Sequence, residues 1–288
     1  MGGEPLRTTI VPTDDLHIAL ARTALAEDAP TGDLTSRLVV PEDATCTAEI
    51  RAKAAGVLAG RAAAEAIFEA AGEVDGSVEL TWKAEDGTEL EPGELVAVLR
   101  GSARAILRAE RPALNLLAHL SGIATLTRAF VRAAAPARIL CTRKTTPGLR
   151  ALEREAVAAG GGELHRASLS EAVLIKDNHV RLAGGVGEAV RRARSADVPV
   201  EVEVEDLDGL EEALAAGADR VLLDNAGPEL VAAAVARVGD PARLEISGGV
   251  TLEGLPALVR AGARLISVGR ITHSAPALDL SLEVTGAD

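Results

Sequence analysis

Residues 200–225 read VEVEVEDLDGLEEALAAGADRVLLDN, two short apolar runs rich in valine and leucine with a helical stretch between them. The pattern predicts strands at Val200–Val204 and Arg220–Leu223, and a helix at Leu207–Ala216 that ends at Gly217. A strand, a helix and a second strand at this spacing form a unit whose two strands pair in parallel. This stretch therefore predicts an α/β fold.

The same alternation continues on both sides of this unit. The further strands are predicted at Arg138–Thr142, Ala172–Ile175, Arg243–Ile246 and Arg264–Val268. The further helices are predicted at Leu149–Ala159, Val186–Ser195, Pro228–Val238 and Leu252–Ala261. Six strands in this order favour an open, incomplete α/β barrel, and an open doubly wound sheet is the main alternative.

The N-terminal part shows no strand–helix repetition and predicts an α+β sandwich domain. Its helices are predicted at Asp14–Glu27, Ala62–Ala71 and Arg104–Leu120. Its strands are predicted at Asp43–Ala54, Val57–Ala59, Gly76–Lys83 and Glu94–Arg100. We expect this domain to span residues 1–112 and the barrel to span residues 113–275, with the tail 276–288 returning to the first domain.

Composition indicates a globular chain in a reducing compartment. The 288 residues are 48% hydrophobic and 25% charged, which excludes a largely disordered protein. Met1–Asp15 lacks the pattern of a secretion signal, and no run of eighteen uncharged apolar residues predicts a membrane span. Cys46 and Cys141 form neither a metal-type spacing nor a disulfide framework, so we expect a cytoplasmic protein.

The charge balance excludes nucleic acid as a bulk partner. The net charge is −13, whereas binding to phosphate backbones needs a basic face. The three aromatic residues, Phe68, Trp82 and Phe130, are too few for base stacking. An acidic chain can still hold a local cationic pocket for a small anion.

Polar residues follow each predicted strand. The segments are Thr142-Arg143-Lys144-Thr145, Lys176-Asp177-Asn178-His179, Glu201-Val202-Glu203, Asp224-Asn225, Ser247-Gly248-Gly249 and Gly269-Arg270. Because ligands bind at the carboxyl ends of parallel strands, these segments predict one mixed pocket. The glycine segments, the first of which precedes a helix, suit a phosphate.

Each of these residues also has an ordinary structural interpretation. Glu201, Glu203 and Glu205 lie on one face of their strand, and any of them could be a salt-bridged surface residue. Asp224 could be a helix cap, and His165 could be a core histidine. His179 and His273 do not have the spacing of a zinc site.

Taken together, the cations predict a strongly anionic substrate. They are Arg143, Lys144, Arg166 and Lys176. Glu203 and Asp224 suit a divalent cation, sugar hydroxyls or a developing positive charge. A phosphorylated sugar and a carboxylated co-substrate fit all of these features.

These motifs resemble the quinolinate phosphoribosyltransferase family, and they keep the order of that family over nearly the whole chain. The resembling segments are Glu27-Asp28 with Thr31-Gly32-Asp33-Leu34-Thr35, Glu110-Arg111, Leu114-Asn115, Leu120-Ser121-Gly122-Ile123-Ala124-Thr125, Thr142-Arg143-Lys144-Thr145-Thr146-Pro147-Gly148-Leu149-Arg150, Gly160-Gly161-Gly162, His165-Arg166, Leu174-Ile175-Lys176-Asp177-Asn178-His179, Val202-Glu203-Val204, Leu223-Asp224-Asn225, Ser247-Gly248-Gly249 and Thr272-His273-Ser274.

The resemblance implies a pentosyltransferase of NAD biosynthesis. It implies that quinolinate and 5-phosphoribosyl-1-diphosphate react, with Mg2+, to give nicotinate mononucleotide, diphosphate and carbon dioxide. It also implies an N-terminal α/β sandwich, an open barrel and a homodimer, or a higher oligomer, in which the partner completes each site. No nucleic acid or membrane partner is implied.

The resemblance also implies residue roles. Arg111 (from the partner subunit), Arg143, His165, Arg166 and Lys176 would bind the dicarboxylate, and Lys144 would lie between the substrates. Glu203 and Asp224 would serve the ribose and, directly or indirectly, the metal. The residues implied to surround the 5-phosphate are Ser247, Gly248, Gly249, Gly269 and Arg270. Lys144, Lys176, Glu203 and Asp224 would be catalytic.

Three further hypotheses fit the same residues. Ser168 and Glu171 stand where the family pattern has other residues, so a paralogous phosphoribosyltransferase for another pyridine carboxylic acid is one hypothesis. Lys144 or Lys176 could form a Schiff base in a barrel lyase. A non-catalytic anion-binding protein is the third hypothesis.

Overall fold

The computed structural model describes residues 13–287 of the chain. Residues 1–12 lie outside the described residues. They make up most of Met1–Asp15, the segment in which we expect no secretion signal. The chain divides into two units, one of Met1–Ser121 with Ala277–Asp288 and the other of Gly122–Pro276. The expected domain boundary at residues 112/113 falls inside a long helix that supplies residues to both units.

The first unit contains a four-stranded antiparallel sheet of order β12-β1-β5-β3. Its strands are β1 (Thr45–Ala52), β3 (Val78–Trp82), β5 (Leu95–Ser102) and β12 (Leu280–Ala287). The strands β2 (Gly56–Val57) and β4 (Glu89–Leu90) form a separate pair. Its helices are α1 (Thr13–Asp28), α2 (Leu34–Val39), α3 (Arg61–Asp75) and the first part of α4 (Ala103–Ala134).

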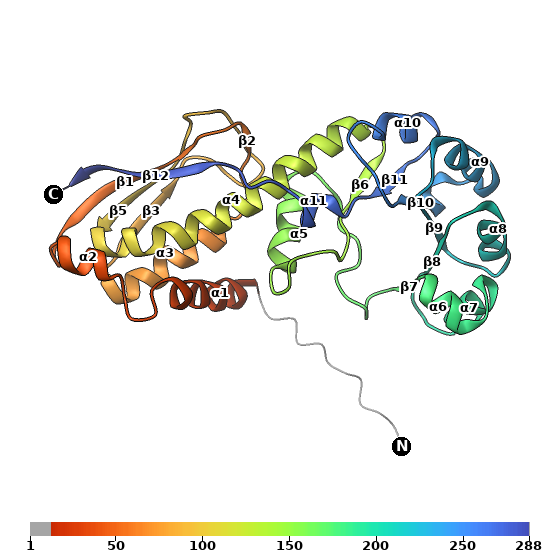
Figure 1. The fold of residues 1–288 in the computed structure, drawn as a ribbon, viewed down its shortest axis with the longest axis horizontal. Coiled ribbons are helices and arrows are strands. Elements are labelled where there is room, and N and C mark those ends of the chain that lie inside the picture. The colour runs from red at the N-terminus through yellow and green to blue at the C-terminus, as the bar shows by residue number, and fades with distance from the viewer. Residues whose placement is uncertain (1–12, 288) are drawn as a thin grey trace, which may run out of the picture. The chain divides into compact units, whose positions relative to one another are not determined.

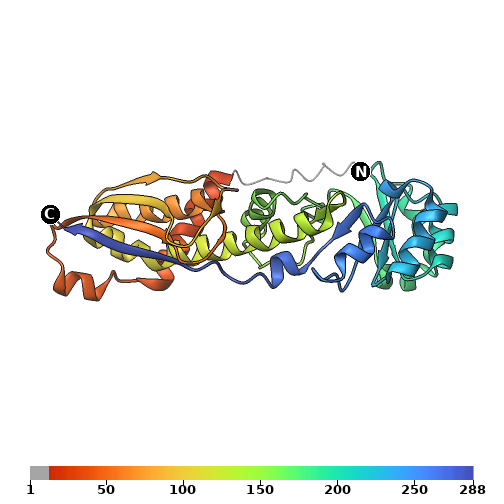
Figure 2. The same cartoon turned by 90° about the horizontal axis from the view of Figure 1, so that it is seen from above.

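Alternation along β1 decides which face of this sheet is buried. Cys46, Ala48, Ile50 and Ala52 are almost fully buried, and the residues between them are more exposed. A period of two places these four side chains on one face, against the apolar faces of the helices. The C-terminal strand β12, dark blue in Figures 1 and 2, pairs antiparallel with β1, drawn in orange.

The second unit is a parallel sheet with helices between its strands. Its strands are β6 (Arg138–Leu140), β7 (Val173–Ile175), β8 (Val200–Val204), β9 (Arg220–Asp224), β10 (Leu244–Ser247) and β11 (Leu265–Ser267). Its helices are α5 (Arg150–Ala159), α6 (Asp177–Ala183), α7 (Val186–Ala193), α8 (Leu207–Ala215), α9 (Pro228–Val238), α10 (Leu255–Arg260) and α11 (Arg270–His273), with a 3-10 turn η1 (Pro241–Arg243). Figure 1 shows α8 and α9 outside the strands that they connect.

The strand order confirms an incomplete barrel. The order is β6-β11-β10-β9-β8-β7, so β7 to β11 follow chain order and β6 pairs with β11. A doubly wound sheet would reverse its strand order in the middle. Here the first and last strands of the repeat are neighbours, as in a barrel, and the barrel stays open between β6 and β7.

The sequence missed the short elements and the full length of α4. Helix α6 has no buried residue, so its sequence carries no apolar period to find. Helix α4 has 32 residues and is the one helix among residues 13–287 that is long and apolar enough to cross a membrane. Half of its most apolar window is buried within the structure, as expected of a core helix.

The glycines that follow α5 have a packing role. A Cβ at Gly160 would lie 2.6 Å from the Ala124 carbonyl oxygen and 2.6 Å from Thr127 Cβ, both on α4. A Cβ at Gly162 would lie 2.8 Å from Thr127 Cγ2. These distances are shorter than van der Waals contact, so the backbone can approach α4 only without side chains.

We expect Gly160→Ala to lower the free energy of unfolding by about 1–3 kcal/mol, because overpacking forces the two segments apart. Gly72→Ala in helix α3 is the control, since a Cβ at Gly72 would lie no closer than 3.6 Å to a neighbouring atom. That control should be neutral or stabilising because alanine favours helix. Urea unfolding measures both, and an equal effect of the two substitutions would contradict the close packing.

Candidate active site

The carboxyl ends of the parallel strands meet around one cavity of about 360 Å³, which we call the central cavity. It is lined by Cys141, Thr142, Arg143, Lys144, His165, Arg166, Leu174, Lys176, Glu203, Leu222, Asp224, Glu245, Ser247 and Ser267. All four cations singled out in the sequence are among these residues. The two carboxylates Glu203 and Asp224 line the same cavity.

A second cavity, also of about 360 Å³, lies at the last two strand ends, and we call it the glycine cavity. It is lined by Lys144, Ser247–Thr251, Ser267–Arg270, His273 and Ser274. Lys144, Ser247 and Ser267 line both cavities, so the two are adjacent. All predicted phosphate-binding residues therefore lie beside the predicted dicarboxylate site.

Close backbone approach explains one of these glycines directly. Gly248 has a φ of +81°, and a Cβ there would lie 2.5 Å from Asp224 Oδ1 and 2.4 Å from Asn225 Oδ1. The side-chain amide of Asn225 donates a hydrogen bond of 2.6 Å to Asp224 Oδ2. Gly248 thus lets the β10 end lie against Asp224, which keeps that carboxylate at the cavity wall.

Arg143 and Arg166 line the central cavity, and each also carries one N–H that is closed to solvent. The Nε atoms of Arg143 and Arg166 are buried, and neither has a hydrogen-bond acceptor among the described residues. The other end of Arg166 is held, because Nη1 donates to the Ala172 carbonyl oxygen at 2.9 Å. Burial, and next the charge of Arg143, lower the pKa of Arg166. An anionic ligand in the cavity would offset the charges of these two guanidinium groups.

Lys176 and Glu203 form an ion pair across the ends of β7 and β8. The Lys176 side chain is half-exposed, and Glu203 is mostly buried. Of the three glutamates that share one strand face, Glu203 faces the cavity, Glu201 is buried behind it and Glu205 is exposed. The structure therefore separates the three roles that the sequence left open.

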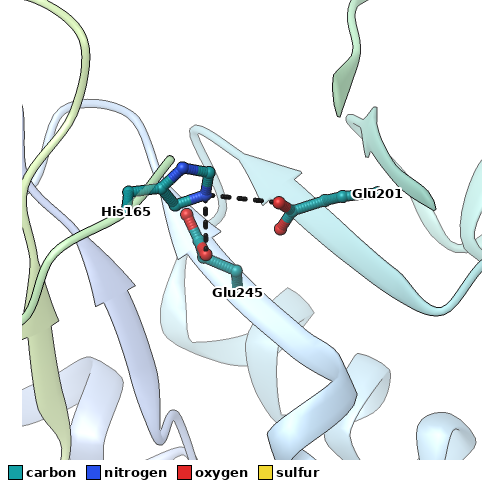
Figure 3. A group of neighbouring side chains, drawn as sticks. All are labelled: His165, Glu201 and Glu245. Atoms are coloured by element: carbon teal, nitrogen blue, oxygen red, sulfur yellow. Dashed lines mark ion pairs between the residues drawn. The ribbon is translucent and has the colours of Figure 1, made fainter. Parts of the chain in front are cut away.

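A buried cluster of His165, Glu201 and Glu245 lies at the base of the cavity (Figure 3). His165 Nε2 lies 3.3 Å from Glu201 Oε2 and 3.6 Å from Glu245 Oε2. Arg220 Nη1 approaches Glu245 Oε2 at 3.7 Å from the next strand. Glu245 is fully buried, so these two cations balance a charge that would otherwise be very costly.

Two effects on the ring of His165 oppose each other. The Glu201 and Glu245 carboxylates raise its pKa to about 9, because they favour the charged imidazolium. The Arg166 backbone N–H donates to Nδ1 at 2.9 Å, which favours a neutral ring with its proton on Nε2. We expect the two carboxylates to dominate, since ionic groups outweigh one amide. Burial raises the pKa of Glu201 in turn.

These three side chains have the spacing of a metal site, but the hydrogen bonds do not suit one. A metal would need the lone pair of Nε2, whereas Nε2 carries a proton toward Glu201 and Glu245 both in the imidazolium and in the neutral ring that the amide at Nδ1 favours. The carboxylates of Glu203 and Asp224 instead face the open cavity, and oxygen donors of this kind suit Mg2+.

Arg111 is the one predicted site residue that lines neither cavity. It lies on α4 in the first unit, its side chain is 65% exposed, and its nearest ion-pair partner is Glu110 at 3.9 Å. Its assignment to a partner's site stays a prediction.

Ser168 and Glu171 also line neither cavity. Glu171 Oε2 accepts the backbone N–H of Ala167 at 2.7 Å, and Ser168 Oγ donates to Glu171 at 3.4 Å. Both residues close their own loop, so the geometry gives no support to a changed substrate.

The sequence missed Glu245 and Arg220 as parts of the site, and it placed Glu201 at a strand end without assigning it a role. A signal for the first was present, since Glu245 stands between Leu244 and Ile246 in a buried strand. A charged residue at such a position needs a buried partner.

Comparisons with known proteins agree over nearly the whole chain. Residues 33–121 match the N-terminal domain of quinolinate phosphoribosyl transferase, and residues 123–283 match its C-terminal domain. A probable nicotinate-nucleotide pyrophosphorylase [carboxylating] of Bacillus subtilis is 46% identical over 264 residues, covering 90% of each chain. A nicotinate-nucleotide pyrophosphorylase [carboxylating] of Mycobacterium leprae is 40% identical and covers 91% of this chain and 95% of its own.

A solved structure gives the same result. The nicotinate-nucleotide pyrophosphorylase of Francisella tularensis superposes with a TM-score of 0.88 and 39% identity, covering 94% of this chain and 97% of its own.

The raised pKa of His165 predicts a pH-dependent contribution to stability. Because the pKa rises from 6.5 to about 9 on folding, the contribution is complete below pH 6.5 and is lost as the pH rises through about 9. Relative to His165→Gln, the wild-type protein should lose about 1–3 kcal/mol of stability over this window.

NMR titration of the His165 ring measures the pKa directly. Glu245→Gln should lower it, since one of the two carboxylates loses its charge. A wild-type pKa near 6.5 would contradict the prediction and show that the Arg166 amide keeps the ring neutral.

Proposed function

The chain belongs to the quinolinate phosphoribosyl transferase family, and we propose that its central and glycine cavities together form the active site. The protein is a quinolinate phosphoribosyltransferase (decarboxylating) that produces nicotinate mononucleotide in NAD biosynthesis. The observation that carries the site assignment is the grouping of four cations and two carboxylates around one cavity, beside a glycine-lined one.

In our proposal the pyridine dicarboxylate lies in the central cavity. The guanidinium groups of Arg143 and Arg166, which line this cavity, support this, since a carboxylate offers the two acceptors that a guanidinium prefers. His165 and Lys176 add charge at the base and the rim. Arg111 of the partner subunit would complete the site in a homodimer.

The phosphoribosyl group would lie across the boundary between the cavities. Ser247, Gly248 and Gly249 would donate to the 5-phosphate from one strand end, and Gly269 and Arg270 from the next. Lys144, which lines both cavities, would lie between the two substrates. The side-chain oxygens of Glu203 and Asp224 would face the ribose.

The residues present fit the proposed chemistry. As the bond from C1 of the ribose to diphosphate breaks, positive charge grows on the sugar, and the carboxylates of Glu203 and Asp224 stabilise it. These carboxylates would also hold Mg2+, which offsets the charge of the diphosphate leaving group when bound. Lys144 and Lys176, which line the same cavity, would add positive charge near the leaving group.

The pyridine nitrogen then donates its electron pair to C1 and becomes quaternary. Holding both reactants in one geometry contributes on the order of several kcal/mol to this step. When the adjacent carboxylate leaves as carbon dioxide, the bonding pair stays on the ring carbon beside the quaternary nitrogen, and a proton then replaces it. The decarboxylation therefore needs no dedicated acid beyond the source of that proton.

The geometry gives no support to a Schiff-base lyase. A Schiff-base lysine must be a neutral amine, whereas Lys176 is paired with Glu203 and Lys144 is exposed. We also propose a cytoplasmic location. The two cysteines are free and buried, as is usual for a protein in a reducing compartment.

Incubation with quinolinate, 5-phosphoribosyl-1-diphosphate and Mg2+ should release carbon dioxide and give a product with the mass of nicotinate mononucleotide. Lys144→Ala should lower kcat by at least about 100-fold, since it removes a charge beside the reacting groups. Its free energy of unfolding should change by no more than about 0.5 kcal/mol, because the side chain is exposed.

Nicotinate in place of quinolinate is the control, and it should give no product. Binding of the phosphoribosyl donor without carbon dioxide release would instead indicate an anion-binding protein. Chelation of Mg2+ should abolish turnover, and its return should restore it.

Arg111→Ala and Lys176→Ala should each be inactive as pure proteins, because each removes one cation from every site. Mixing them with subunit exchange should restore activity at about a quarter of all sites, since half of the random dimers are mixed and each has one intact site. Differently tagged subunits report the exchange. Confirmed exchange with no recovery of activity would exclude the shared site.

A further inference from the structure

Helix α5 carries three charged side chains on one face, at the spacing i, i+3 and i+4. They are Arg150, Glu153 and Arg154, which we call the positioning face. None of them lines the central cavity or the glycine cavity. Each contacts a loop that carries substrate-binding cations in the proposed site.

Arg150 joins two loops that are far apart in the sequence. Its Nε donates to Thr145 Oγ1 at 3.0 Å, in the loop of residues 142–149 that carries Arg143 and Lys144. Its Nη1 donates to the Ala167 carbonyl oxygen at 3.1 Å, in the loop of residues 163–172 that carries His165 and Arg166. One guanidinium therefore fixes the separation of two pairs of cations.

Glu153 contacts the backbone of the first loop, residues 142–149. Its side chain is fully buried, and its two carboxylate oxygens accept the Thr146 backbone N–H at 3.2 and 3.4 Å. The single N–H is shared between the two oxygens, and both distances lie at the long end of the range for hydrogen bonds. The contact holds the backbone two residues beyond Lys144.

Arg154 holds the second loop. Its Nη1 donates to the His165 carbonyl oxygen at 2.6 Å and lies 3.8 Å from Cys141 Sγ. The His165 backbone N–H in turn donates to Cys141 Sγ at 3.4 Å. The backbone of His165 is thus held on both sides between α5 and the end of β6.

These contacts matter because the two loops have almost no regular secondary structure, and the hydrogen bonds within each loop are local. Residues 142–149 contain no helix or strand, and residues 163–172 contain a single bridge at Glu163. Their cations repel one another, which favours separation of the loops in the absence of an anion. A rigid helix that contacts both loops opposes that separation.

We propose that Arg150, Glu153 and Arg154 are positioning residues that hold the two cation-bearing loops at the separation the pyridine dicarboxylate requires. The inference rests on the proposed function for the identity of that substrate. The three residues act through the loops and touch no substrate themselves.

The test compares steady-state kinetics of Arg150→Met, Thr145→Val and the double variant with the wild type. Methionine keeps the apolar volume of Arg150 and removes its donors, and valine keeps the shape of Thr145 and removes the acceptor. Arg237→Met is the matched control, since Arg237 on α9 forms an exposed ion pair with Glu211 on the neighbouring helix α8.

Arg150→Met should raise the KM for quinolinate about tenfold, the expected loss for two backbone or hydroxyl hydrogen bonds. The KM for 5-phosphoribosyl-1-diphosphate should rise less than that for quinolinate, because Lys144 is the one residue of the two loops that lines the glycine cavity. The double variant should have the same KM for quinolinate as Arg150→Met alone, since both substitutions remove the same hydrogen bond between Arg150 and Thr145. Arg150→Lys should restore part of the affinity.

A merely structural role would lower the active fraction and leave KM unchanged. An unchanged KM for quinolinate in folded Arg150→Met and in Thr145→Val would therefore overturn the proposal. If Arg150→Met does not fold, Arg150→Lys and Thr145→Val decide by the same criterion.

Hydrogen–deuterium exchange separates this proposal from the proposed function. Without substrate, Arg150→Met should exchange faster than Arg237→Met in both loops, at residues 142–149 and 163–172. Unchanged exchange in both loops overturns the positioning role. A wild-type protein that fails to convert quinolinate refutes the proposed function, and the exchange result still decides whether α5 holds the loops.

Discussion

Repulsion between like charges is the constraint on which this site depends. Four cationic side chains lie around one cavity in a chain whose net charge is −13. Acidic partners offset part of the repulsion: Glu203 pairs with Lys176, and the buried pair Glu201 and Glu245 faces His165. Arg143 and Arg166 keep buried donors without a partner among the described residues. In the proposed site, a dianionic substrate would correct the remaining imbalance.

Much of the fold was predictable because the apolar residues of its helices and strands follow the spacing typical of each element. The strand Val200–Val204 and the helix Pro228–Val238 were predicted with the bounds that the structure has. Helix α6, with no buried residue, gave no such signal and was missed. The sequence predicts a helix that ends at Leu120, whereas α4 continues through Ser121 and Gly122 to Ala134. Burial of the helix on both sides of Gly122 outweighs the weak helix propensity of that glycine.

The site was predictable where chain order alone decides position. A parallel sheet brings every strand end to one edge, so Arg143, Lys176 and Asp224 had to lie together. The sequence could not give contacts that depend on the curvature of the sheet, such as that of His165 with Glu245 on β10. Nor could it give the role of α5, because the charges of Arg150 and Arg154 match those of any solvated helix face.

Hydrogen bonding, rather than spacing, decides what each group of carboxylates can do. His165, Glu201 and Glu245 lie close enough to hold a cation, yet the two carboxylates favour a protonated Nε2 on His165, which leaves no lone pair there for a metal. Arg220 supplies the second positive charge that Glu245 needs. These buried carboxylates therefore serve the protein's own cations. Glu203 and Asp224 differ because they face the cavity, where a ligand or metal can approach them. Carboxylates thus offset buried cations in one place and line the open cavity in another, where the proposed reaction would take place.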